Sequence, residues 1–235
     1  MRRGIVFLSI SFTLLLGCAI GPMYHVKIDS ISGVDADMKR KYILLSGLKD
    51  VHPNDLEFRE YASYVEKALA SAGYIRAGNF KDANIAIFLA YGIGDPKEHQ
   101  YTYSLPVRGQ TGVSSSTTYG TITSYGGYGT YHGTTTYTPT YGITGYTTHV
   151  GSYTSFFRFF ILDAVDLEEY QRSDKVVQIW RTTVTSRGSS GDLRKVFPIL
   201  VAAAKSYIGT DTGKQIEVTL TEDDKAVLEI KGLPK

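Results

Sequence analysis

The sequence predicts an α+β fold: a two-layer sandwich of a mixed, largely antiparallel sheet with two helices on one face and a long low-complexity insert. Two stretches carry apolar residues at helical spacing, near residues 54–72 and 192–207. Around them lie short apolar stretches of strand length. The first helical stretch separates apolar runs at 42–45 and 85–91, which is the order of a right-handed βαβ unit.

The first half of the folded chain is expected to supply three strands and a helix. Residues 24–28 alternate between apolar and polar side chains, which predicts a half-buried strand, and 42–45 form a continuous apolar run. Asn54 is placed to cap the following helix, and Gly73 is placed to end it. Residues 85–91 are apolar on both faces, which predicts a central strand.

The second half is expected to contain more strands, joined as hairpins. Residues 98–107 are expected to return as a strand, and residues 155–162 and 176–184 to pair around a charged loop at 163–175. Because the ligand order of a calcium loop is absent, a solvated turn is favoured over a calcium or acid–base site in that loop. The acidic residues concerned are Asp163, Asp166, Glu168 and Glu169.

The C-terminal part is expected to hold the second helix and two short strands. The helix, about residues 192–207, contains Pro198, and proline inside a helix costs about 3 kcal/mol or more. Two alternatives remain: the helix kinks there, or a short first turn precedes a main helix that begins near Pro198. Residues 215–220 and 226–230 are predicted to be short strands.

The insert, residues 109–151, is dominated by Tyr, Thr, Gly and Ser, and no charged side chain occurs from Gly109 to Phe157. Three alternatives stay open: a mobile solvated loop, a β-prone or tyrosine-rich contact surface for self-association, glycan or partner protein, and a membrane-inserted hairpin. The tyrosines of the possible contact surface keep no period of two, which argues against insertion. They are Tyr119, Tyr125, Tyr128, Tyr131, Tyr137, Tyr141 and Tyr146.

The N-terminus carries a basic start, an apolar run and a cysteine. Two arginines precede an apolar run at residues 5–16, which is too short for a membrane-spanning helix of about 20 residues. Leu15-Leu16-Gly17-Cys18 then resembles a lipobox, whose cysteine is lipidated after the signal peptide, here residues 1–17, is removed. Cys18 is the only cysteine in the chain, so no disulfide is expected.

The lipobox resemblance implies a lipid anchor and a location. The lipid on Cys18 would attach the protein to a membrane through a short tether, residues 18–23, ahead of a single α+β domain at 24–235. Ala19 is not the aspartate that the sorting rule of Gram-negative bacteria associates with inner-membrane retention. The outer membrane, on its periplasmic side, is therefore the expected location.

Charge and motif content exclude several classes of function. Without Arg2 and Arg3 the chain carries 23 basic and 23 acidic residues, so it lacks the electrostatic footprint of a nucleic-acid-binding protein. No nucleophile elbow, phosphate-binding loop or dinucleotide fingerprint occurs, so we expect no enzyme activity and no cofactor. No metal site is expected, because the histidines show no ligand spacing. They are His25, His52, His99, His132 and His149.

Several motifs together resemble bacterial lipoproteins built on a domain of unknown function. Besides the lipobox and the Tyr/Gly-rich middle, they are Val26-Lys27-Ile28-Asp29, Ala72-Gly73-Tyr74, Ala83-Asn84-Ile85-Ala86-Ile87 and Ile179-Trp180-Arg181 before a proline-containing helix. The resemblance implies an envelope location, no established catalysis and no catalytic residue. The expected function is non-enzymatic binding of an envelope protein or glycan. The alternative is a self-assembling structural or secretion accessory lipoprotein, and the oligomeric state stays open.

Overall fold

The protein is described by a computed structural model that covers residues 21–36, 38–125 and 128–234, with the side chains of 123–131 left out. The chain divides into two units. One contains the chain up to Asp95 and again from Phe156 onward, and the other is Pro96–Ser155. The lipobox and Cys18 lie outside the described residues.

The first unit is built on a mixed open sheet in which strands follow the order β3-β2-β4-β6-β7-β1-β8. Strand β2 pairs in parallel with β3 and β4, and the other neighbours are antiparallel. The predicted mixed sheet is therefore confirmed. Its strands are β1 (Tyr24–Ser32), β2 (Lys41–Ser46), β3 (Ile75–Arg76), β4 (Ile85–Ile93), β6 (Tyr128–Asp166), β7 (Gln178–Gly188) and β8 (Ile216–Leu220).

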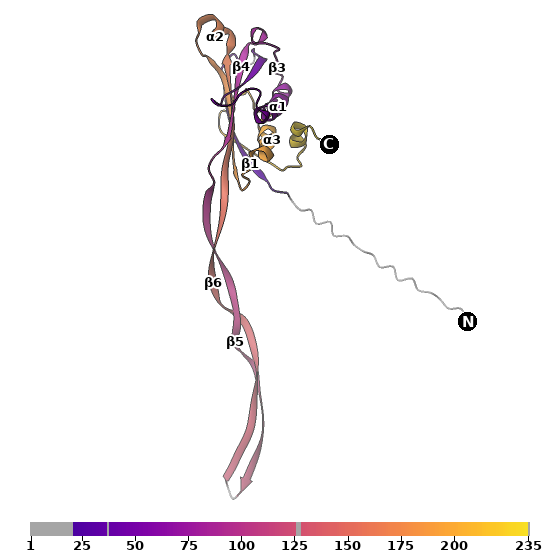
Figure 1. Cartoon of the computed structure of the whole chain (residues 1–235). Coiled ribbons are helices and arrows are strands. Elements are labelled where there is room, and N and C mark those ends of the chain that lie inside the picture. The colour runs from indigo at the N-terminus through magenta and orange to yellow at the C-terminus, as the bar shows by residue number, and fades with distance from the viewer. Residues whose placement is uncertain (1–20, 37, 126–127, 235) are drawn as a thin grey trace, which may run out of the picture. The chain divides into compact units, whose positions relative to one another are not determined.

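Four α-helices accompany the sheet (Figure 1). They are α1 (Leu56–Ser71), α2 (Leu167–Ser173), α3 (Leu193–Ala204) and α4 (Lys225–Lys231), with a 3₁₀ turn at Phe80–Asp82. Helix α1 lies between the parallel strands β2 and β4 in sequence, as the predicted βαβ order requires. Gly73 follows its end with φ +85°, a conformation that glycine adopts without steric cost.

The main hydrophobic core contains residues of α1, α3 and α4 together with alternate residues of β1, β4 and the end of β6. An aromatic cluster joins these elements: the Tyr61 ring of α1 lies 4.3 Å from Phe197 of α3 and 4.7 Å from Tyr91 of β4, measured between ring centres. Phe160 of β6 lies 5.4 Å from Phe197. Helix α1 and helix α3 therefore pack on each other as well as on the sheet.

Several boundaries and elements differ from the sequence-based expectations. Residues 226–230 were expected as a strand but lie in α4, where Val227 and Ile230 are buried three residues apart on one helical face. The N-cap of α1 is Asp55, not Asn54, and the Asp55 carboxylate accepts a hydrogen bond from the His52 backbone N–H. The helix predicted to 207 ends at Ala204.

Pro198 lies inside α3, which is uninterrupted from Leu193 onward. The alternative in which the main helix begins near Pro198 is therefore wrong. The Asp192 carboxylate caps this helix and accepts a hydrogen bond of 3.1 Å from the Lys195 backbone N–H. The cap satisfies one of the free N–H groups at the start of the helix.

The second unit is one long antiparallel pair of strands, β5 (Lys97–Tyr125) and the first part of β6. The pairing runs from Lys97 opposite Ser155 to Tyr125 opposite Tyr128, and Figure 1 shows the two strands coiling about each other. We call residues 97–125 and 128–155 the ribbon. The insert lies within it, so the alternative of a loop without secondary structure is wrong for the described backbone.

Candidate functional site

The ribbon has two free edges. Among the described residues, β5 pairs only with β6, and residues 128–155 of β6 pair only with β5. Each strand therefore presents a row of N–H and C=O groups along its outer side. These rows can hydrogen-bond to an added strand.

One face of the ribbon carries an aromatic stripe near Lys97 and Ser155. The register places His99 opposite Tyr153 and Tyr103 opposite His149, and alternation puts Tyr101 on the same face. Ring centres lie 4.9 Å apart for His99 and Tyr153 and 5.5 Å apart for Tyr103 and His149, and both pairs are stacked. The three tyrosines are 43–54% exposed, so the stripe can contact a partner.

A glycine makes room for the middle ring of the stripe. Gly151 lies opposite Tyr101, and a Cβ at Gly151 would fall 2.7 Å from the Tyr101 ring. Because that distance is shorter than real Cβ contacts allow, any other residue would displace the ring. Tyr101 thus covers the backbone of the neighbouring strand, an arrangement that stabilises glycine in sheets.

The tyrosines proposed from the sequence do not gather on one face. Tyr119, Tyr137, Tyr141 and Tyr146 are all exposed by 62–74%. Tyr119 lies opposite Thr134 and Tyr137 opposite Ser116, so the alternation directs the two rings to opposite faces. The side chains of Tyr125, Tyr128 and Tyr131 lie outside the described part.

The aromatic stripe lies outside the insert, so the sequence-based prediction of a contact surface does not include it. Its members His99, Tyr101 and Tyr103, followed by Leu105 and Val107, occupy every second position, which is the period of a strand. That pattern was the available signal. It lies in the segment that was predicted to be a strand but was not considered as a contact surface.

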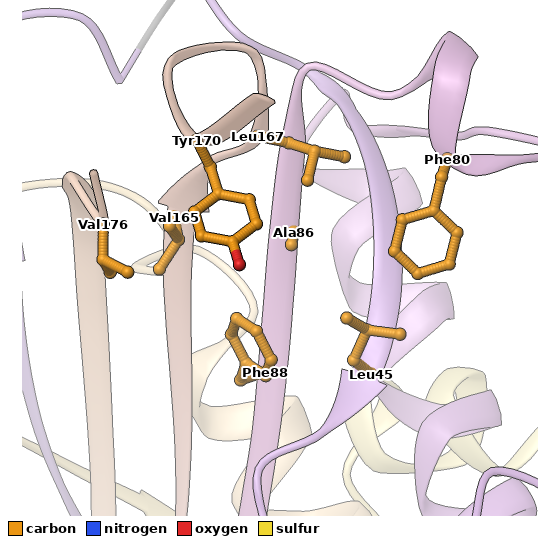
Figure 2. A pocket seen from close by; sticks show the side chains of 8 residues that line it. All are labelled: Leu45, Phe80, Ala86, Phe88, Val165, Leu167, Tyr170 and Val176. Atoms are coloured by element: carbon orange, nitrogen blue, oxygen red, sulfur yellow. The ribbon is translucent and has the colours of Figure 1, made fainter. Parts of the chain in front are cut away.

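A pocket of about 300 Å³ lies in the first unit, on the side of β2 and β4 that carries a small second core (Figure 2). Its lining is apolar except for the Tyr170 hydroxyl, which Figure 2 shows hanging from α2 toward Phe88. The lining has no carboxylate, histidine or cysteine, so it fits an apolar group. The residues are Leu45, Phe80, Ala86, Phe88, Val165, Leu167, Tyr170 and Val176.

Helix α2, which carries part of this pocket, replaces the solvated turn predicted at 163–175. Asp166 caps it by accepting a hydrogen bond from the Glu169 N–H, and the Lys39 ammonium donates to Asp166 at 2.7 Å and to Glu168 at 2.9 Å. Burial tends to raise the pKa of Asp166, but the hydrogen bond from Lys39 lowers it below its usual value. Asp163 instead pairs with Arg181 of β7.

The carboxylates around a second pocket, of about 500 Å³, already have protein partners. Glu60 forms an ion pair of 2.9 Å with Arg194, and Asp192 caps α3. Burial raises the pKa of Tyr61. The negative charge of Glu57 and the hydrogen bond that the Tyr61 hydroxyl donates to Glu57 raise this pKa further. In the described chain no group of three or more His, Cys, Asp or Glu residues is arranged to hold a metal ion.

Within the described ranges, no helix is long and apolar enough to span a membrane. Neither a protein-family model nor a curated protein matches the sequence. The chain is similar to one solved structure, a PDZ domain protein from Parabacteroides distasonis, with 10% identity and a TM-score of 0.36. The similarity covers 86% of this chain and 40% of that protein.

Proposed function

We propose that the protein is a non-enzymatic lipoprotein of the bacterial outer membrane, anchored on the periplasmic side by lipid on Cys18, that binds an envelope partner through the ribbon. The observation that carries the binding role is the pair of free strand edges along residues 97–125 and 128–155. An edge binds an extended segment through main-chain hydrogen bonds. Backbone groups of this kind favour a protein partner over a glycan.

The proposed membrane location rests on the sequence. The leader and the Leu15-Leu16-Gly17-Cys18 motif support lipidation, and five residues separate Cys18 from Tyr24, where β1 begins. The balanced charge leaves the lipid as the membrane contact, because no polybasic segment is present to attract anionic lipid. The finer architecture is also part of the proposal: α1 and α3 cover one face of the sheet, supported by their shared core.

Two measurements test the anchor. The full chain is expected to incorporate radiolabelled palmitate and to sediment with the envelope, whereas Cys18→Ser is expected to lose both properties. A Cys18→Ser protein that still sediments with envelopes, or a wild type without label, would overturn the lipid anchor.

The binding role is tested by placing a photo-crosslinking amino acid on the ribbon. Positions Tyr119 and Tyr137 sample its two faces, and Val34, which is 98% exposed in the first unit, serves as the matched control. Adducts are expected from the ribbon positions and not from Val34. Equal adducts from Val34, or none from the ribbon, would contradict the role of the ribbon.

The second candidate function is a self-assembling structural or secretion accessory lipoprotein. It is favoured by one observation: the two free edges belong to antiparallel strands of the same hairpin, so one copy carries both halves of a strand-to-strand contact.

A further inference from the structure

The ribbon leaves much of its hydrogen-bonding capacity unused. A two-stranded hairpin is marginally stable by itself in water, and three or more strands with a packed face are needed for independent stability. Here β5 is 29 residues long, and the ribbon has no third strand in the described chain. An added strand on either edge would supply what the ribbon lacks.

The part of the ribbon farthest from Lys97 and Ser155 is the most regular. Residues 115–125 and 128–138 form eleven consecutive pairs, whereas the register shifts all lie between Val107 and Ser115. A strand added over such a stretch forms about ten hydrogen bonds, at roughly one per residue of an antiparallel ladder. A typical protein interface has about ten direct hydrogen bonds.

The chemistry of these edges fits another copy of the same segment. Proteins prevent edge-to-edge pairing with charged side chains, prolines and bulges. No Asp, Glu, Lys or Arg occurs from Gly109 to Phe157, and neither proline nor register shift interrupts 115–125 or 128–138. Two copies therefore meet without like-charge repulsion.

We propose that the ribbons of neighbouring copies join edge to edge, with β6 of one copy antiparallel to β5 of the next. This inference rests on the proposed function, because a lipid on the same residue places all copies in one leaflet. When two neighbouring ribbons share one orientation, the free edge of β6 meets a β5 edge that runs in the opposite direction. Parallel β5–β5 contact also keeps the orientation, but parallel pairs are less stable and occur almost only in covered sheets.

The contact repeats, because each copy binds one neighbour through its β6 edge and another neighbour through its β5 edge. Such a head-to-tail contact produces a ring or an open row of copies, rather than a symmetric pair that stops at two. The partner of the ribbon is thus a second copy of this chain.

Cysteine pairs on the same face of the ribbon test this arrangement in isolated envelopes. Directly opposite residues of neighbouring strands have Cβ atoms about 4.5–5.5 Å apart, close to the distance that a disulfide requires. Thr117→Cys on β5 is co-expressed with a differently tagged copy that carries a cysteine on β6. Three such partners, two residues apart, sample the unknown register between copies: Thr134→Cys, Thr136→Cys and Thr138→Cys.

Two controls accompany the pairs. Thr135→Cys lies on the opposite face and is not expected to react with Thr117→Cys. Thr117→Cys and Thr136→Cys in one chain occupy opposite positions of the same ribbon and are expected to form an intrachain disulfide, which verifies the register. Cys18 contributes no thiol when it carries the lipid.

The expected result is a disulfide between Thr117→Cys and at least one of the three β6 variants. This mixed dimer should be absent when either variant is expressed alone. An intrachain disulfide without any mixed dimer would overturn the inference, as would failure of the intrachain disulfide. Equally abundant dimers of Thr117→Cys alone would replace the arrangement by β5–β5 pairing. Photo-adducts with a different protein, without mixed dimers, would leave the proposed function standing and remove the second copy as partner.

Discussion

Removal of the whole second unit tests whether the sheet and helices fold independently of the ribbon. Gly94 donates its backbone N–H to the Phe157 carbonyl at 2.7 Å, so β4 and β6 are already paired where the ribbon begins. Replacing Pro96–Ser155 by Asn-Gly would close this pair as a two-residue hairpin, because Asn-Gly favours the type I′ turn that such hairpins use.

The expected change in the free energy of unfolding follows from core composition and loop length. The main core and the small second core of the described residues contain no side chain from 96–155, so the deletion removes no core contact. Shortening a flexible closure from 60 residues to two would gain about 3 kcal/mol, at about 0.6 kcal/mol for each halving. Because the paired ribbon already holds its ends together, the expected gain lies between zero and about 3 kcal/mol.

Trp180 is the reporter for this measurement. It is the only tryptophan in the chain, it lies in β7 of the first unit, and it is 1% exposed. Urea unfolding is followed by Trp180 fluorescence in two chains that begin at Ala19, one with and one without the second unit. The chain without the second unit is expected to have a midpoint equal to or higher than that of the other. A free energy of unfolding lowered by more than about 1 kcal/mol, or exposed tryptophan fluorescence without urea, would refute the independence of the first unit.

Three substitutions are expected to have distinct effects. Leu162→Ala, at a fully buried position of β6, should lower the free energy of unfolding by about 2–5 kcal/mol in the same assay, and a loss below 1 kcal/mol would contradict the core assignment. Asp166→Asn keeps the cap of α2 but weakens the contact with Lys39. Because the pKa of Asp166 is lowered in the fold, the wild type should be more stable than this variant above pH ~4, and this advantage should vanish as the pH falls through the lowered pKa. Urea midpoints of the two proteins that keep a constant difference at several pH values would refute this pH dependence. Gly151→Val should displace the ring opposite and reduce amide protection near the aromatic stripe in hydrogen exchange, whereas Gly145→Val, with no atom within 4 Å of the added Cβ, should not; equal protection in both variants would contradict the close packing.

Periodicity predicted most of the first unit correctly because its elements have one buried side. Strand β1 and helix α1 show this pattern, whereas β4 is buried on both faces, as its continuous apolar run predicts. Residues 226–230 were predicted wrongly because a five-residue apolar run fits either a strand or a helix. The helix forms there, and Val227 and Ile230 enter the main core.

The ribbon could not be predicted from the same rules, because the part of the chain that the structure describes buries neither of its faces. Its strand pairing leaves Thr, Ser, Gly and Tyr on both sides, so no apolar alternation marks residues 115–138 in the sequence. The aromatic stripe was accessible to sequence reasoning, since residues 99–107 keep a period of two. Its cross-strand partners His149 and Tyr153 were not, because the register of strand pairing is weakly specified where neither face is buried.

The position of β1 controls when the first unit can be completed. This strand, the first of the described residues, is hydrogen-bonded to β7 on one side and to β8 on the other, and the paired residues lie 148 to 196 positions apart in the sequence. Such distant contacts form slowly, because the intervening chain must be brought together first. A chain synthesised from its N-terminus therefore cannot complete this sheet until residues up to 220 are available to pair with β1.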